Sequence, residues 1–505
     1  MPSFQHFPLG TRIPDSPHAV VVSLPTIADV IGYEERHVET MDVVRMGYPR
    51  FIRHPYLTQA ARKLSAGTPI GTRAQFPVAS ASAARRVIEL LGLQPGPAAG
   101  ILETDGWALL HLDPADASLA QRAAKIIQHT GIGISSREAE DWLVRHGHLR
   151  HAFPEKNLPG DATATVLHAL SPWLAPAAPG SILLCRSGMN AFFAAFEASH
   201  ALQRRAGRTL WLQLGWLYAD TTEIFLKCLP PDESLRTITN VFDKEAILRF
   251  FAENGHRTAA VITEAPNNPL IQTPDLPWLA SLARQHGALC LFDPSTCGLA
   301  NTDLLPHADV LVASLTKYCA HEGDVMAGVL AVNPASPWHD ALRDGARAAH
   351  SPPYWRDSAR LAAEIATMPE TVARINANTL HLAAWLEGHP SVRRVCWTRE
   401  ASSRDNYAAI CRTPESVGGL ITIELDMPLA RFYDRLKTAK GPSFGTDYTL
   451  ASPYIYMAHY DCVIDAAKRR KLQACGIDPE LVRISVGTEP WEEIEATLAH
   501  ALDKA

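Results

Sequence analysis

Short apolar runs alternate with stretches of helical length between residues 180 and 335. The apolar runs predict strands, and they are SILLC (181–185), TLWLQL (209–214), TAAVIT (258–263), ALCLFD (288–293), DVLVAS (309–314) and VMAGVLAV (325–332). Residues 189–205 and 275–287 have the apolar spacing of amphipathic helices. Near-continuous runs of valine, isoleucine and leucine between helices are typical of a parallel sheet that is covered on both faces. The pattern therefore predicts an α/β fold with a mostly parallel sheet and helices on both of its faces.

The regions on either side differ from this one in composition and in the pattern of their predicted elements. Residues 1–175 mix short elements and are rich in proline and arginine, and the segment 172–180 is typical of a linker. After residue 336 the sequence predicts mostly helices, the last of them near 491–503. Two strands are predicted among these helices, GLITIEL (419–425) and LVRISV (481–486). We therefore expect three parts, namely an N-terminal region at 1–175, a large domain at 176–335 and a smaller α+β domain at 336–505.

The composition fits a globular protein with a large core, because 47% of the residues are hydrophobic and 20% are charged. The net charge of −6 shows no basic excess, which argues against a nucleic-acid partner. The sequence has no apolar run of the roughly 18 residues that a membrane span needs, and its start lacks the features of a secretion signal. Nine dispersed cysteines without a CxxC pair indicate reduced thiols, so we expect a cytoplasmic protein.

Polar residues at the carboxyl ends of the predicted strands are the first candidates for a site, because ligands of α/β proteins gather there. Four strands end in such groups, which are Arg186-Ser187-Gly188-Met189, Glu264 to Asn268, Asp293, and Ser314-Leu315-Thr316-Lys317. Each group has an ordinary explanation by itself, since Ser187 can cap a helix and Lys317 can be a solvated charge. Together they offer what pyridoxal phosphate (PLP) needs: a Schiff-base lysine, a carboxylate for the ring nitrogen and a phosphate cup at a helix start.

Three other patterns predict no site. His146, His148 and His151 lie close together, but no cysteine or carboxylate cluster accompanies them, so we expect a solvated loop and no metal. The GxG pattern at 131–133 lacks a third glycine, which argues against a dinucleotide site. Ser135 and Glu138 are spaced as a capping box and predict the start of a helix.

Several segments resemble the Cys/Met-metabolism family of PLP-dependent enzymes. They are EAPNNPLIQTPDL (264–276), LFDPS (291–295), SLTKY (314–318), DVMAGVLAVN (324–333), VRISVGTE (482–489) and GYPRFIRHP (47–55). The chain is most similar to the long, fungal-type cystathionine γ-synthase branch, through PHAVVVSLPTIADVIGYE (17–34), HTGIGISSREAED (129–141) and GPSFGTDYTLASPYIYMAHY (441–460). The resemblance covers almost the whole chain except an apparent insertion at about 68–150. It implies a PLP-dependent transferase of fold type I, with a seven-stranded type of sheet and a smaller C-terminal domain.

The resemblance also implies which residues hold the cofactor. Lys317 would form the covalent link to PLP and carry protons between Cα, Cβ and Cγ of the substrate. Tyr218 would stack on the ring and assist proton transfer, and Asp293 would pair with the ring nitrogen. The phosphate would be held by Gly188, Met189, Ser314 and Thr316.

Two further groups follow from the same resemblance. Arg483 and Ser443 would bind the substrate carboxylate, and Asn268 would contact either that carboxylate or the ring hydroxyl of PLP. Tyr48 and Arg50, in a subunit-contact segment at about 40–60, would reach the phosphate of a neighbouring subunit. We therefore expect a homodimer or homotetramer with shared active sites.

The chain departs from the family pattern at a few positions. Ala219 and Asp220 replace the glycines that usually follow the stacking tyrosine, and Tyr448 stands where many members have a glutamate. The spacing from Tyr48 to Pro55 is one residue longer than usual. We expect these changes to affect the choice of substrate more than the cofactor.

The activity that the resemblance implies is γ-replacement, in which an activated homoserine ester and cysteine give cystathionine. The alternatives are a C–S β- or γ-lyase, γ-replacement with a different nucleophile, and a non-catalytic PLP-binding protein. The presence of Lys317, Asp293 and Arg483 argues against a non-catalytic protein, because a protein that catalyses no reaction does not need all three.

Overall fold

The computed structural model describes residues 4–158 and 160–503 of the chain. Its largest sheet has seven strands in the order β6 (Ile182–Cys185), β12 (Gly328–Val332), β11 (Val310–Ser314), β10 (Leu289–Asp293), β9 (Thr258–Glu264), β7 (Leu210–Leu214) and β8 (Ser234–Ile238). Every neighbouring pair is parallel except the two that involve β12. The prediction of a mostly parallel sheet is thus confirmed.

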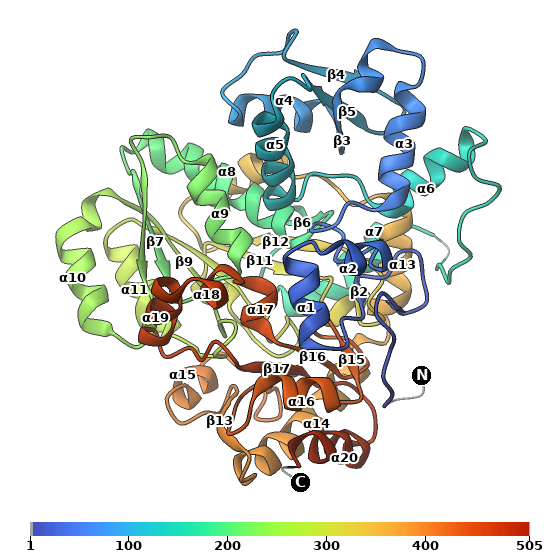
Figure 1. Ribbon diagram of the computed structural model, residues 1–505. Coiled ribbons are helices and arrows are strands. Elements are labelled where there is room, and N and C mark those ends of the chain that lie inside the picture. The colour runs from blue at the N-terminus through green and yellow to red at the C-terminus, as the bar shows by residue number, and fades with distance from the viewer. Residues whose placement is uncertain (1–3, 159, 504–505) are drawn as a thin grey trace.

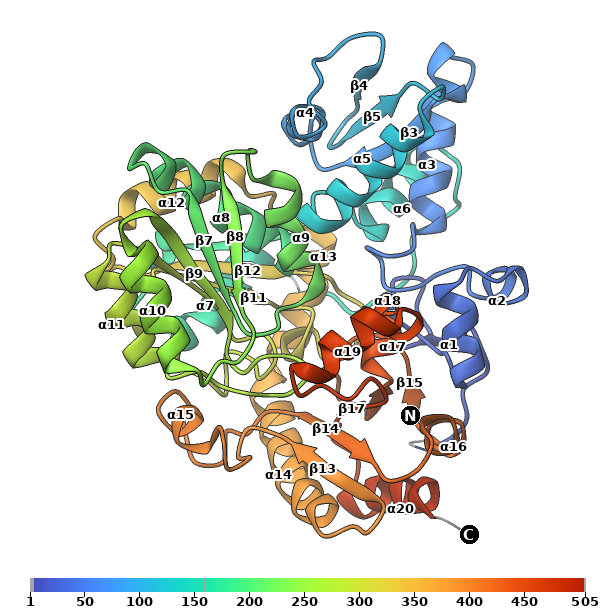
Figure 2. The ribbon, with the colours of Figure 1, turned by 60° about the vertical axis from the view of Figure 1, so that its left-hand side comes forward.

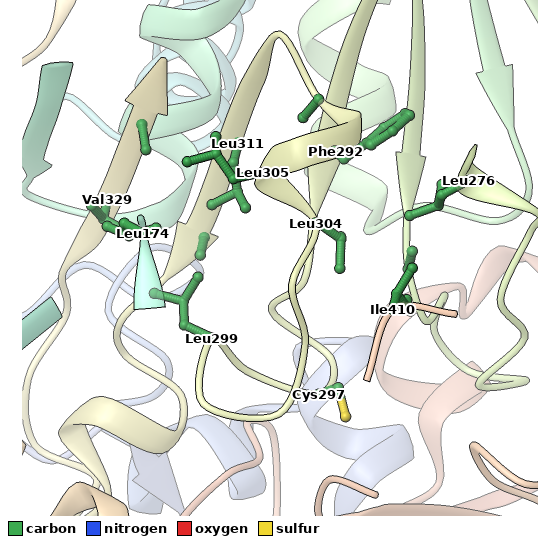
Figure 3. Packing of buried hydrophobic residues seen from close by; sticks show 14 of the residues in the cluster. Leu174, Leu276, Phe292, Cys297, Leu299, Leu304, Leu305, Leu311, Val329 and Ile410 are labelled. Carbon is green, nitrogen blue, oxygen red and sulfur yellow. The ribbon is translucent and has the colours of Figure 1, made fainter. Parts of the chain in front are cut away.

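Helices cover both faces of this sheet (Figures 1 and 2). One face packs against α8 (Gly188–Arg205), α9 (Ala219–Cys228) and α12 (His339–Ala349). The other packs against α7 (Ala162–Leu170), α10 (Lys244–Asn254), α11 (Leu276–Gln285) and α13 (Trp355–Ile365). Alternate residues of each strand enter opposite cores, as when Leu291 faces α8 while Phe292 joins the second core with Leu276 (Figure 3). Burial on both faces explains the apolar runs of these strands, except for the edge strand β8, whose residues are half-buried or exposed.

The C-terminal part forms the predicted smaller α+β domain. Its sheet has the order β13 (Val392–Cys396), β14 (Leu420–Leu425), β17 (Val482–Ser485), β16 (Leu450–Ser452) and β15 (Ala439–Lys440). The helices that pack on it are α14 (Met368–Glu387), α16 (Leu429–Arg435), α20 (Trp491–Leu502) and, from the start of the chain, α1 (Ile27–Glu34). The first residues of the chain therefore belong with the last ones in space (Figure 1).

Residues 68–150, which we call the inserted module, lie above the large sheet in Figure 1. The module contains β3 (Ala74–Val78), α4 (Ala81–Leu90), β4 (Ala99–Glu103), β5 (Ala108–Leu112), α5 (Ala117–Thr130) and α6 (Ser136–Arg145). Its three antiparallel strands have the order β3-β5-β4. Ser135 caps α6 by accepting a hydrogen bond from the Glu138 N–H at 3.1 Å, but the Glu138 carboxylate pairs with Arg186 instead of closing the capping box.

Residues 44–54, which we call the strap, join two distant parts of the molecule. The helix before the strap, α2 (Val38–Val43), and α1 lie beside the small domain, whereas the helix after it, α3 (Pro55–Ser65), packs on α6 of the inserted module. The expected N-terminal region of residues 1–175 is therefore divided among the small domain, the inserted module and, through α7, the large sheet. None of the helices in the described ranges is long and apolar enough to span a membrane.

Candidate active site

A cavity of about 490 Å³ lies at the carboxyl ends of β9, β10 and β11, between the large sheet, the small domain and the strap. Its volume is in the range of small-molecule sites. The predicted residues that line it are Tyr48, Arg50, Gly188, Met189, Tyr218, Asn268, Asp293, Ser314, Lys317, Ser443 and Arg483. Thr316 is absent from this wall, because its hydroxyl accepts a hydrogen bond from the Ala327 N–H at 3.1 Å.

Lys317 follows β11 and projects its amine into the cavity. The amine donates a hydrogen bond to the Ser443 hydroxyl at 2.8 Å and lies 4.8 Å from the centre of the Phe444 ring. Burial lowers the pKa of Lys317 well below its ordinary value, and the nearby guanidinium groups of Arg483 and Arg50 lower it further. The amine therefore loses its proton more readily than an exposed lysine does. The neutral amine is the form that attacks an aldehyde and accepts a proton.

Two carboxyl groups meet on the neighbouring strands β9 and β10. Glu264 and Asp293 are register partners at the ends of these strands, and both line the cavity. Burial raises the pKa of each group, and Asp293 raises that of Glu264 further. Neither has a cation as a close partner among the described residues. A protonated ring nitrogen in front of this pair would supply the missing positive charge, so the site fits PLP at this end.

Another part of the cavity wall, at the start of α8, fits the phosphate of PLP. Ser187 caps α8 through the Asn190 N–H at 3.1 Å, so Gly188 and Met189 form the first turn of an 18-residue helix. A Cβ on Gly188 would lie 2.8 Å from the Ser314 Cβ, which shows that glycine is needed for the close approach of α8 and β11. A helix start offers free N–H groups and a positive dipole end to an anion.

Arg483 projects from β17 of the small domain into the same cavity. Its guanidinium donates to the Ser443 carbonyl at 2.8 Å and to the Asn268 side-chain oxygen at 3.3 Å, and it lies between the rings of Phe444 and Tyr454. It forms no ion pair with a carboxylate in the described part of the chain. A buried guanidinium that is positioned but not neutralised is suited to an incoming carboxylate.

The strap brings Tyr48 and Arg50 into the cavity of their own chain, where the sequence predicted a neighbouring subunit's cavity. Arg50 donates to the Tyr218 hydroxyl at 2.8 Å and forms an ion pair with Asp220. The strap is anchored by apolar contacts at both ends, so it passes over its own site. Asp220 stands where the family usually has a glycine, and its ion pair with Arg50 explains this difference.

Sequence reasoning missed several residues of the cavity wall. Glu264 was recognised as a strand-end residue but given no role, and the α5 residues Gln128 and His129 lie in a module without a predicted function. Tyr448, which was expected near the substrate, is not part of the wall, because its hydroxyl donates to the Ile13 carbonyl at 3.2 Å.

The sequence pattern of the family described as Cys/Met metabolism PLP-dependent enzyme matches residues 163–503. The chain belongs to this family. PLP is therefore its cofactor, and the chain is an enzyme of the PLP-dependent synthase and lyase type.

Relatives include enzymes that act on different amino acids. The chain is 38% identical to the L-2-amino-4-chloropent-4-enoate dechlorinase/desaturase of Streptantibioticus cattleyicolor over 98% of both chains. It is 28% identical to the cystathionine γ-synthase of Neurospora crassa over 100% of this chain and 99% of that one. Among solved structures, the cystathionine γ-synthase of Xanthomonas oryzae pv. oryzae has the same fold, with a TM-score of 0.57 and 23% identity over 68% of this chain and 86% of that one.

We predict that Lys317→Ala abolishes turnover, with a loss of at least about 100-fold, because the variant lacks both the covalent anchor and the proton carrier. Borohydride treatment of the unaltered enzyme should attach PLP to the peptide that contains Lys317, as measured by mass spectrometry. Lys244→Ala, at a half-exposed lysine that begins α10 and does not line the cavity, serves as the control and should keep both activity and labelling. A fully active Lys317→Ala enzyme would contradict the assignment of the site.

We predict that Arg483→Ala lowers kcat/KM by roughly 30-fold or more, because truncating one partner of a buried guanidinium–carboxylate pair costs about 2–5 kcal/mol. Arg483→Lys should recover part of the loss, since lysine brings charge without the planar fork. PLP content should stay near normal in both variants. Arg393→Ala, at an arginine on β13 with 53% of its side chain exposed, is the control. Unchanged kinetics for Arg483→Ala with every amino acid that the enzyme converts would refute this role.

A mixed assembly tests whether the strap acts within its own chain. Arg50→Ala and Lys317→Ala chains carry two different tags, are co-expressed and are purified together. We predict that their activity per intact Lys317 does not exceed that of Arg50→Ala chains alone. The reason is that each chain supplies Arg50 to the cavity that contains its own Lys317. A clear gain of activity in the mixed assembly would show instead that the strap is exchanged between subunits.

Proposed function

We propose that this enzyme removes a leaving group from the γ-carbon of an L-α-amino acid, by elimination or by replacement. The observation that carries the proposal is the position of the Lys317 amine, which lies beside Ser443 and is therefore close to Arg483, the residue that we assign to the substrate carboxylate. A lysine next to the arginine that binds the substrate carboxylate can reach the α-carbon. By rotation of its flexible side chain it can also reach the β- and γ-carbons.

Different residues of the cavity wall would bind the substrate, transfer protons and exclude water. PLP, when bound, supplies an electron-withdrawing ring at the α-carbon of the substrate. Arg483 and Asn268 would fix the carboxylate, and Lys317 would take the α-proton and return protons at later positions. Tyr218, whose hydroxyl accepts a hydrogen bond from Arg50, would hold the ring from one side. The packed rings of Phe444 and Tyr454 would keep water from the reacting carbons.

The relatives support the γ-carbon as the position that reacts. The name of the Streptantibioticus enzyme describes a substrate with chlorine on C4, which is the γ-carbon. The leaving group of a homoserine ester occupies the same carbon. We favour elimination for this chain, because the Streptantibioticus enzyme, which is 38% identical over 98% of both chains, is named for a dechlorination and desaturation. The γ-replacement predicted from the sequence is the second candidate, supported by the full-length similarity to cystathionine γ-synthase.

We predict that the holoenzyme releases chloride from L-2-amino-4-chloropent-4-enoate, or the acid from O-acetyl-, O-succinyl- or O-phosphohomoserine, without added cysteine. Released anion and amino-acid product would be measured by ion chromatography and mass spectrometry, with Lys317→Ala as the control. Formation of cystathionine only when cysteine is present would establish the second candidate. If PLP-loaded enzyme released nothing from any of these four compounds in either condition, the γ-carbon proposal would be wrong.

We also infer that two or four chains assemble and that the protein works in the cytoplasm. The family resemblance supports the first point, and Trp355, an exposed aromatic residue with 61% of its surface accessible, is a candidate contact. The second is supported by the nine cysteines, all of which are free thiols. Light scattering measures the number of chains in the assembly.

A further inference from the structure

Helix α5 of the inserted module ends directly behind the loop that we assign to the cofactor phosphate. Helix α5 is closed by Gly131, which has a φ of +64° and donates its N–H to the Ile127 carbonyl at 3.1 Å. A Cβ on Gly131 would lie 2.2 Å from the Ser187 hydroxyl oxygen and 2.8 Å from the Asn190 nitrogen. The α5 terminus therefore touches the residues that begin α8, with no space for a side chain between them.

The last turn of the same helix supports Arg50. The Gln128 carbonyl accepts a hydrogen bond from the Arg50 guanidinium at 3.0 Å. The Gln128 side-chain amide donates to Asp220 at 3.2 Å, and Asp220 is the ion-pair partner of Arg50. One residue of α5 thus fixes both the guanidinium and the carboxylate that neutralises it.

The module is tied to α8 by more than these polar contacts. Ile126 and Ile132, on either side of Gly131, belong to one apolar cluster with Phe192 and Phe193 of α8. Helix α5 also packs against α9, which carries Asp220. Because protein cores are closely packed, a shift of α5 would move the start of α8.

We propose that the inserted module sets the affinity for PLP, with Gly131 and Gln128 as positioning residues for the phosphate cup and for Arg50. Gly131 keeps the Ser187 loop in the position where its N–H groups converge, and Gln128 keeps Arg50 directed toward the cavity. The proposal rests on the assignment of Gly188 and Met189 to the phosphate. It assigns a cofactor-binding role to a segment whose sequence predicted none.

The chain offers a matched control for Gly131. Gly147 also lies in the module and has a positive φ of +72°, but a Cβ there would have no atom within 4 Å. Alanine at either position has the same unfavourable left-handed backbone, so the difference between Gly131→Ala and Gly147→Ala isolates the contact with Ser187. We expect the PLP dissociation constant of the apoenzyme, followed by absorbance during reconstitution, to rise roughly tenfold or more in Gly131→Ala, which corresponds to about 1.4 kcal/mol. It should stay within about twofold in Gly147→Ala.

A second pair of variants covers the case in which Gly131→Ala does not fold. Gln128→Leu removes the amide that holds Asp220, and Gln121→Leu makes the same change on the exposed face of the same helix. We expect weaker PLP binding, by roughly threefold or more, in Gln128→Leu only. Equal PLP affinities within each pair, whether both normal or both reduced, would overturn the proposal. Failure of the underlying site assignment is recognised separately, because borohydride would then leave Lys317 unlabelled in the unaltered enzyme.

Discussion

Three cationic side chains converge on one cavity at the carboxyl edge of the large sheet, and their mutual repulsion in a buried space governs the rest of the site. Arg50 is neutralised by Asp220, whereas Arg483 has no carboxylate partner among the described residues. Burial lowers the pKa of Lys317, and the guanidinium groups of Arg483 and Arg50 lower it further, because the protein interior screens charge poorly. Such a cavity is stabilised when anions enter it. A phosphate and an amino-acid carboxylate are the anions that the geometry accommodates.

A pair of carboxyl groups, on β9 and β10, lines the same cavity. Glu264 and Asp293 cannot both be ionised without cost, because they are neighbours in a buried wall. A protonated ring nitrogen in front of the pair would relieve this cost. With PLP placed as we propose, its ring nitrogen would face the two carboxyl groups and its phosphate would face the cationic side chains, and both contacts would favour its binding.

Much of this site could be predicted from the sequence because its central residues follow apolar strands. Asp293 is the last residue of β10, and Lys317 follows the end of β11 by three residues. Such strands are easily recognised by their apolar runs. β8 was missed because its residues are half-buried or exposed and show no such run. The place of Arg50 within its own chain could not be predicted, since it depends on the path of the strap between two distant anchors. Thr316 was assigned by resemblance, but its hydroxyl bonds to the backbone at Ala327.

The common core of the inserted module and α8 also limits how far the chain could be shortened. Solved structures with this fold match about two thirds of the sequence, for example 68% for the Xanthomonas enzyme. A compact version of the chain would be made by deleting residues 68–150. Such a deletion would uncover Phe192, Phe193 and the apolar residues around them. A freshly exposed aromatic surface of this kind promotes aggregation. A trimmed enzyme would therefore need new polar residues along α8 before it could remain in solution.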